Sequence, residues 1–254
     1  MRFENQVAVI TGASEGIGRA TAESMAREGA AVAVVARNAA KLEELVAGIV
    51  AGGGRAIACP GDATDPALAV VVAAEALGRF GTIDVLVNCV GGSTVVANPS
   101  APLEETDPAD WRRVIGFNMD PTFYFCRAVI PAMKKQRAGR IVNLSSVAAH
   151  GRTGMTNASY SAAKGGIIAF TKKLAIELAP WGINVNATAP GLTLSERLAE
   201  KWNAMDREKQ HAVQARIPLG RPSTPQEQAD VICFLASSAA AYVTGVTIDV
   251  TGGA

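Results

Sequence analysis

The sequence contains few residues of the kinds that build disulfide-rich, metal-binding or nucleic-acid-binding proteins. Its 254 residues include 4 cysteines and 2 histidines, and 24 Lys and Arg residues are balanced by 23 Asp and Glu residues. The balance argues against a nucleic-acid partner, which usually requires a basic surplus on one face. The widely separated Cys59, Cys89, Cys126 and Cys233 form neither a Cys-x-x-Cys redox pair nor a zinc cluster. We expect reduced cysteines in a cytoplasmic protein, and no metal site.

Long apolar runs are also missing. The longest, near residues 68–74, is interrupted by Glu75 and is too short to span a bilayer. Glu4 and Asn5 stand where a signal peptide would carry its apolar segment. We therefore expect no membrane partner and no secretion. With 49% hydrophobic and 19% charged residues, the chain is too apolar to be disordered.

The chain alternates short β-branched runs with longer segments of helical spacing. Most of the runs are apolar without strict alternation, as in parallel strands covered on both faces. The pattern predicts an α/β fold, a Rossmann-type doubly wound parallel sheet flanked by helices, in one domain over residues 1–254. The seven predicted strands are Val7–Thr11, Ala31–Ala36, Arg55–Ala58, Ile83–Asn88, Arg140–Leu144, Asn184–Ala187 and Val246–Val250.

One stretch, residues 192–216, departs from this alternation. It carries many charges of both signs, and Leu198, Trp202 and Met205 form one apolar stripe at helical spacing. An insertion after a late strand often serves as a lid. An ordinary surface hairpin would instead pack its stripe on the domain, and the sequence leaves both interpretations open. We expect His211, in the same stretch, at the surface.

A glycine-rich turn follows the first predicted strand. It reads Thr11-Gly12-Ala13-Ser14-Glu15-Gly16-Ile17-Gly18 and leads into a segment of helical spacing. Glycines let a pyrophosphate approach closely, and a helix N-terminus offers it free N–H groups. The first gap is one residue longer than in the usual dinucleotide fingerprint. The strand before the turn and the helix after it nevertheless favour a phosphate site over a simple tight connection.

The end of the second predicted strand bears on the choice of nicotinamide cofactor. A carboxylate there binds the ribose hydroxyls of NAD, whereas a basic side chain accepts the 2′-phosphate of NADP. The strand is followed by Arg37, which favours NADP unless it is only a solvated loop cation. Glu15 counts against NADP because its charge could lie near that phosphate. We expect NADP(H) to be preferred, with NAD(H) possible.

A candidate proton-transfer group lies in the second half of the chain. Tyr160 and Lys164 are four residues apart at the start of a long helical segment, so they share a helix face. A nearby ammonium lowers the pKa of a tyrosine from its ordinary value near 10. The strand at 140–144 delivers Ser145 and Ser146 to its carboxyl end, where ligands bind in open α/β sheets. Tyr-x-x-x-Lys alone is common by chance, but joined to the glycine turn and this serine it becomes specific.

Because of these residues and their spacing, the chain resembles a classical short-chain dehydrogenase/reductase over nearly its whole length. The family implies hydride transfer between a nicotinamide cofactor and a carbonyl or secondary-alcohol substrate. It also implies a homotetramer in which the helical segments 108–135 and 158–178 pair across a two-fold axis. The motifs that carry the resemblance are residues 11–18, Asp62, Asn88-Cys89-Val90-Gly91, Asn118, Ser146, Tyr160-x-x-x-Lys164, Pro190-Gly191 and residues 249–253.

The resemblance also implies roles for single residues. Tyr160 is implied as the general acid/base, and Lys164 as the residue that holds the nicotinamide ribose and lowers the tyrosine pKa. Ser146 is implied as a donor to the substrate oxygen, and Asn118 as a support of Lys164 through a water. The implied cofactor contacts are Gly12, Ser14, Glu15, Gly16, Ile17, Gly18, Arg37, Asp62, Ala63, Asn88, Val90, Gly91, Tyr160, Lys164, Pro190, Gly191, Thr193 and Ser195.

The chain departs from the family pattern at three points. Cys89 and Val90 replace an Asn-Ala pair, and the glycines that follow are similar to some dihydrodiol and hydroxy-acid dehydrogenases of the family. Ser195 replaces the usual threonine. The interval from Ser146 to Tyr160 is 14 residues, slightly long, which leaves Ser145 as an alternative.

Two other functions therefore stay open. One is an NAD-dependent cyclic dihydrodiol dehydrogenase, and the other is a non-catalytic dinucleotide-binding redox sensor, a type that usually loses the tyrosine or lysine.

Two features near the expected substrate site have two interpretations each. His150 and Arg152 lie in a loop that borders the substrate in the family, and Arg152 could bind a carboxylate through two of its guanidinium nitrogens. An isolated basic loop residue is more often simply solvated. Trp202 and Met205 cover an apolar substrate or only anchor the 192–216 segment.

Overall fold

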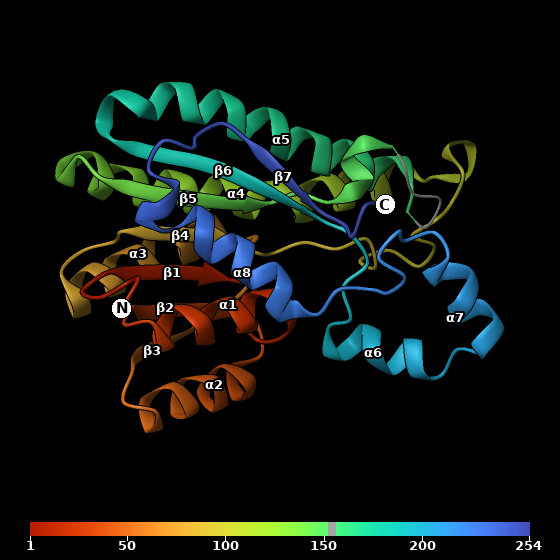
Figure 1. The fold of residues 1–254 in the computed structure, drawn as a ribbon. Coiled ribbons are helices and arrows are strands. Elements are labelled where there is room, and N and C mark those ends of the chain that lie inside the picture. Colours follow the sequence, from red (N-terminus) through yellow and green to blue (C-terminus); the bar gives the residue numbers. More distant parts are fainter. Residues whose placement is uncertain (152–155) are drawn as a thin grey trace.

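The computed structural model describes residues 1–151 and 156–254. It is built on one seven-stranded sheet in which every neighbouring pair of strands is parallel, in the order β3-β2-β1-β4-β5-β6-β7 (Figure 1). The predicted Rossmann-type sheet is therefore confirmed. The strands are β1 (Val7–Thr11), β2 (Ala31–Ala36), β3 (Arg55–Pro60), β4 (Val85–Asn88), β5 (Gly139–Leu144), β6 (Ile183–Pro190) and β7 (Thr247–Val250).

Helices cover both faces of the sheet (Figure 1). One face carries α1, α2 and α8, and the other carries α3, α4 and α5. The helices are α1 (Gly16–Arg27), α2 (Ala39–Ala51), α3 (Pro66–Phe80), α4 (Pro108–Gln136), α5 (Ala158–Leu178), α6 (Glu196–Asn203), α7 (Arg207–Gln214) and α8 (Pro225–Leu235). Among the residues described, none of these helices has the length and hydropathy needed to cross a bilayer.

The core explains why the strands lack alternating polarity. Successive strand residues point to opposite faces. In β1, Ala8 and Ile10 pack with the helices of one face, while Val9 packs with those of the other. Both faces must therefore be apolar. The predicted strand ends differ from the observed ones by three residues at most, at β6, which continues to Pro190 and buries Thr188 completely.

The segment predicted as a lid or a surface hairpin forms α6 and α7, which lie beside the carboxyl edge of the sheet, away from its centre (Figure 1). A backbone bridge between Thr193 and Ser223 joins the two ends of this segment. Both helices lie wholly in the described part of the chain, and neither contains a buried residue. The apolar stripe of Leu198, Trp202 and Met205 is half-buried.

Candidate active site

The predicted site residues gather at the carboxyl edge of the sheet. The edge is where ligands bind in open α/β sheets, at the point where the strand order reverses. Here the reversal lies at β1, which pairs with β2 on one side and β4 on the other. Strand ends along this edge are followed by the glycine turn (β1), Arg37 (β2), Asp62 (β3), Cys89 (β4), Ser145 (β5) and Gly191 (β6).

The glycine turn presents a helix N-terminus that accepts an anion. A Cβ on Gly18 would lie 2.3 Å from the carbonyl oxygen of Gly12, so only glycine lets the turn close this tightly. Glu15 occupies the N-cap position of α1 but makes no side-chain cap. Instead, the N–H of Gly16 donates to the Glu196 carboxylate over 2.8 Å. That carboxylate occupies a position suited to a phosphate, and the residues of the turn therefore fit a dinucleotide cofactor.

Residue 196 opens α6, so the 192–216 segment reaches across to the glycine turn. A Cβ on Gly16 would lie 3.0 Å from the Cβ of Ser195, which shows how closely the segment covers the turn. Thr193 is buried, and its hydroxyl lies 2.9 Å from that of Ser223. The structure thus supports the interpretation of this segment as a cover over the edge of the sheet.

The expected adenosine side of the site contains charges of both signs. Ala36 and Pro60 are paired in register, so Arg37 and Asp62 follow neighbouring strand ends. The pKa of Asp62 is lowered, chiefly by the backbone N–H of Thr64, which donates to it over 3.0 Å, and also by the nearby charge of Arg37. Ala63 is buried in the core beside this end of β3.

One charged residue on this side was missed by the sequence reasoning. The Nζ atom of Lys41, in the first turn of α2, lies 3.0 Å from the Glu15 carboxylate. A lysine following Asn38 by three residues looks like an ordinary surface helix residue. The fold brings it to the glycine turn, and no sequence motif indicates this.

The two candidate serines take different places at the end of β5. The Ser145 hydroxyl is buried and donates to the carbonyl oxygen of Lys164 over 2.8 Å. The Ser146 side chain lies beside Tyr160, where it acts to lower the tyrosine pKa, and it accepts from the N–H of Ala148 over 3.2 Å. The geometry therefore favours Ser146 over Ser145 as the residue next to the reacting groups.

The cap of α5 places the tyrosine and the lysine. The Asn157 side chain accepts from the N–H of Tyr160 over 3.1 Å, which starts the helix at this point. Lys164, one turn later, is almost fully buried, and its Nζ donates to the carbonyl oxygen of Leu144 over 2.8 Å. The Nζ atom lies 5.9 Å from the centroid of the Tyr160 ring. The predicted pair is therefore brought together.

The pKa values of this pair differ from the sequence expectation. Burial lowers the pKa of Lys164 to about 8. Burial raises the pKa of Tyr160, and the neighbouring Ser146 side chain opposes this only in part. We expected the ammonium to lower the tyrosine pKa. In the structure desolvation has the larger effect, because it disfavours the charged form of both groups.

Asn118 holds the loop after β4. It is fully buried in α4; its Oδ1 accepts from the N–H of Gly92 over 2.8 Å, and its Nδ2 donates to the carbonyl oxygens of Gly92 and Val114. A Cβ on Gly91 would lie 2.7 Å from both Asn118 Oδ1 and Lys164 Nζ. Gly91 thus lets the loop pack directly against the lysine.

Asn88, Cys89 and Val90 have mainly internal contacts. The Asn88 amide donates to Asn143 over 2.9 Å, and Asn143 donates in turn to Thr171 over 3.0 Å, which links β4, β5 and α5. Burial raises the pKa of the Cys89 thiol to about 12, so the thiol is neutral near pH 7. Val90 packs against the core.

Three further residues were singled out in the sequence, namely His150, Arg152 and His211. Arg152 is outside the described residues. The Nε2 atom of His150 lies 3.0 Å from a carboxylate oxygen of Asp249, and His211 is exposed, as expected.

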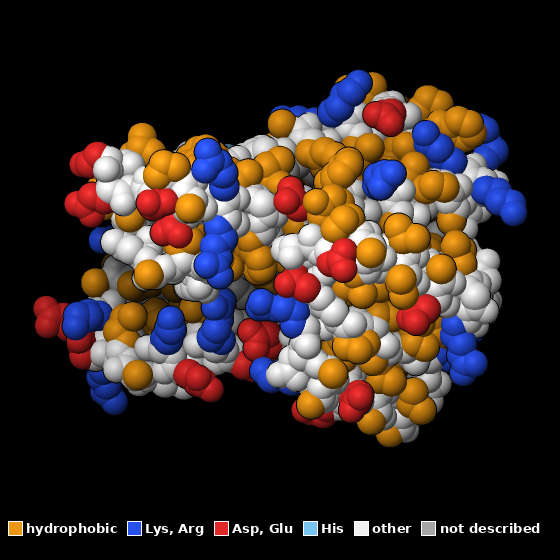
Figure 2. All heavy atoms as spheres, turned by 180° about the vertical axis from the view of Figure 1, so that it is seen from behind, with side chains coloured by type: hydrophobic (Ala, Val, Ile, Leu, Met, Phe, Trp, Pro, Cys, Tyr) orange, Lys and Arg blue, Asp and Glu red, His pale blue; other side chains and the backbone are white. Residues whose placement is uncertain are grey.

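Seen from behind, the surface is hollowed on the side that carries α6 and α7, with Lys, Arg, Asp and Glu side chains around the hollow (Figure 2).

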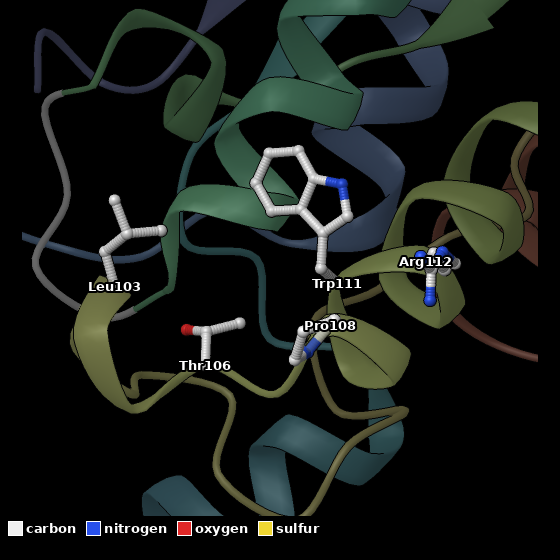
Figure 3. A pocket seen from close by; sticks show the side chains of 5 residues that line it. All are labelled: Leu103, Thr106, Pro108, Trp111 and Arg112. Carbon is white, nitrogen blue, oxygen red and sulfur yellow. The ribbon is translucent and has the colours of Figure 1, made fainter.

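A separate cavity of about 350 Å³ opens at the start of α4 (Figure 3). The indole of Trp111 forms one wall, and none of the predicted site residues lines it. The lining residues are Leu103, Thr106, Pro108, Trp111 and Arg112.

Comparisons with known proteins agree with this geometry. Residues 12–254 match the family described as Enoyl-(Acyl carrier protein) reductase. The chain belongs to the short-chain dehydrogenase/reductase family. It is 41% identical to the short-chain reductase protein NovJ of Streptomyces niveus, over 98% of this chain and 94% of that protein. It is 40% identical to the 1,6-dihydroxycyclohexa-2,4-diene-1-carboxylate dehydrogenase of Pseudomonas putida, over 99% and 93%.

A solved structure is similar as well. The 3-oxoacyl-[acyl-carrier protein] reductase of Brucella melitensis, with bound NAD, superposes with a TM-score of 0.86 at 35% identity and covers 99% of this chain and 93% of that one. The chain is thus an NAD(P)-dependent oxidoreductase of carbonyl and alcohol substrates.

Proposed function

We propose that this oxidoreductase uses Tyr160 as its general acid/base, with Ser146 and Lys164 beside it, and that it prefers NADP(H). The observation that carries the proposal is that the Ser146 side chain lies beside Tyr160, where it acts to lower the tyrosine pKa, while the Lys164 ammonium lies 5.9 Å from the tyrosine ring. The three groups meet at the carboxyl edge of one sheet, beside a glycine turn that accepts an anion.

Each residue has a chemical task in this proposal. When bound, the nicotinamide cofactor supplies or accepts the hydride. In reduction, Tyr160 gives its hydroxyl proton to the carbonyl oxygen as the hydride reaches the carbon, and in oxidation it takes that proton back. Ser146 donates a hydrogen bond to the same oxygen as negative charge develops there. Lys164 holds a positive charge near the phenol, which makes the tyrosinate easier to form.

Removing the Tyr160 hydroxyl by substitution tests this function. Turnover of ketones, keto esters, secondary alcohols and cyclic diols is measured with NADP(H) and NAD(H) for the wild type, Tyr160→Phe and the control Tyr242→Phe, whose side chain is fully exposed. We expect Tyr160→Phe to lose roughly 10²–10⁴-fold in kcat and to keep its affinity for the cofactor. Unchanged turnover in Tyr160→Phe contradicts the assignment. A wild type that binds cofactor but turns over no substrate favours the redox-sensor alternative.

A second candidate is the oxidation of a cyclic dihydrodiol with NAD. Two observations favour it: the Gly91-Gly92 loop lies against Lys164, and the P. putida relative is named for such a substrate. Faster turnover of a cyclic cis-diol with NAD than of any ketone with NADPH would replace the first candidate by this one.

We also propose a homotetramer formed through α4 and α5. Trp111 and Phe123 on α4 are large apolar side chains that are 38% and 49% exposed. Three further apolar residues of these helices, Val114, Ile167 and Leu174, are buried within the chain itself, so they cannot contribute. A monomer in analytical ultracentrifugation contradicts the tetramer.

A further inference from the structure

The Glu15–Lys41 ion pair has no part in the reaction described above. Its two charged atoms are 3.0 Å apart, and both side chains are partly exposed. Asn38 caps α2 by accepting from the backbone N–H of Lys41, which fixes where the lysine leaves the helix. The glycine turn is fixed as well, because the N–H of Ala13 donates to the carbonyl oxygen of Val35 at the end of β2. The pair thus bridges the turn and the segment after β2.

This corner is where a dinucleotide-binding sheet distinguishes NADP from NAD. A ribose 2′-hydroxyl or a 2′-phosphate lies between the glycine turn and the end of the second strand. Glu15 lies in the turn, Arg37 follows β2, and Lys41 lies one helical turn later. The lysine is therefore placed near the group that distinguishes the two cofactors.

Two lysine and arginine side chains near this corner have carboxylate partners. Lys41 binds Glu15, and Arg19 is held by Glu23 of α1 and Glu44 of α2. The charge of Arg37 acts on Asp62, whose pKa it helps to lower. The pKa of Lys41 is raised, first by its hydrogen bond to Glu15, so the lysine carries a full charge near pH 7.

We propose that Lys41 is a specificity-determining residue that leaves Glu15 to bind the 2′-phosphate of NADP(H). The exchange of partners costs little, because an exposed ion pair contributes little to stability. A phosphate monoester carries about −1.5 to −2 charges, so it attracts the ammonium more strongly than a carboxylate does. With NAD(H) there is no phosphate, and Lys41 stays with Glu15. The proposal rests on the proposed preference for NADP(H), and it explains how an acidic glycine turn is compatible with it.

The test uses two cofactor fragments that differ only in the 2′-phosphate. Binding of 2′,5′-ADP and of 5′-AMP is measured by isothermal titration calorimetry for the full chain. Lys41→Gln removes the charge and keeps most of the length, and Lys172→Gln, at an exposed position on α5, is the control. We expect Lys41→Gln to bind 2′,5′-ADP about tenfold more weakly and to bind 5′-AMP within twofold of the wild type. Raising the salt concentration should shrink the difference.

A variant that removes the carboxylate partner of Lys41 provides a second test. Glu15→Gln removes the competing carboxylate and its repulsion, so it should bind 2′,5′-ADP several-fold more tightly and 5′-AMP nearly unchanged. Equal losses for both fragments in Lys41→Gln, or no loss for either, overturn the role of Lys41 while the preference for NADP(H) stands. A wild type that binds the two fragments equally overturns that preference and the role of Lys41 together.

Discussion

The carboxylate of Glu196 caps the helix that begins at Gly16, although the two residues are 180 positions apart in the chain. A cofactor pyrophosphate is drawn to the same helix N-terminus by the same N–H groups. Two anions repel each other, so we expect the Glu196 side chain to turn away from Gly16 when the pyrophosphate binds.

Removing this charge should make cofactor entry easier. We expect Glu196→Gln to bind 5′-ADP and NADPH roughly three- to tenfold more tightly than the wild type, which corresponds to about 1 kcal/mol. Fluorescence titration measures the change, and Glu200→Gln, an exposed residue of the same helix, is the control. Weaker binding in Glu196→Gln alone would mean that the carboxylate supports the bound cofactor and does not compete with it.

The two glycines after β4 allow a matched comparison. Their backbone φ angles are nearly equal, +158° for Gly91 and +157° for Gly92, but only a Cβ on Gly91 meets Lys164 and Asn118. We expect Gly91→Ala to displace the ammonium and to reduce kcat at least 10²-fold, because small errors in position are costly in catalysis. Gly92→Ala should lose much less. Steady-state kinetics and the thermal midpoint of both variants separate this effect from misfolding, and equal losses would contradict it.

Substitution of Ser145 should mainly reduce the stability of the protein, whereas substitution of Ser146 should mainly reduce its catalytic rate. Ser146→Ala removes the hydroxyl that contacts Tyr160, and we expect kcat to fall about 10²–10³-fold with little change in the thermal midpoint. Ser145→Ala leaves the carbonyl of Lys164 without its buried donor. It should cost about 1–3 kcal/mol in the free energy of unfolding and less in kcat. The opposite ranking of the two kcat values would assign the catalytic role to Ser145.

The buried Lys164 ammonium should reduce the stability of the protein at neutral pH. Its pKa is about 8 in the folded chain, against about 10.4 in an unfolded one. Between these values the unfolded chain binds more protons, so the contribution of this group to stability rises with pH and is lost as the pH falls through 8. Below pH 8 the penalty is roughly 3 kcal/mol.

Replacing Lys164 tests whether its buried charge lowers the stability of the folded protein at neutral pH. We expect Lys164→Met to be inactive but about 2 kcal/mol more stable at pH 7, after allowance for the lost hydrogen bond to Leu144. The gain should largely disappear near pH 10.5, where Lys164 is neutral in the folded wild type and only about half protonated in the unfolded chain. Urea unfolding at pH 7 and pH 10.5 measures the difference, with Lys172→Met as the exposed control. A variant less stable than the wild type at pH 7 contradicts the prediction.

The sequence predicted the sheet, the glycine turn and the Tyr160–Lys164 pair because each is a local pattern. A strand, a turn and one helix face are determined by residues within a few positions of one another. Ser146 was expected next to the tyrosine, and Ser145 stayed an alternative because the interval of 14 residues from Ser146 to Tyr160 is slightly long.

The contacts missed from the sequence join distant segments. Glu196 reaches Gly16, Lys41 reaches Glu15, and Asn118 holds Gly92. No spacing rule connects such pairs. The pKa of Tyr160 was misjudged for a related reason, because burial depends on everything packed around a side chain and not on one helix face.

The proposed catalytic residues and the 192–216 segment differ in how deeply their side chains are buried. Lys164, Asn118 and the end of β5 are buried, whereas α6 and α7 contribute no buried residue, although both are fully described. Substitutions at exposed positions usually change stability by less than about 0.5 kcal/mol, whereas buried polar groups that lose their partners cost more. We therefore expect the exposed positions of α6 and α7 to accept new side chains in directed evolution, while the buried residues around Tyr160 tolerate little change.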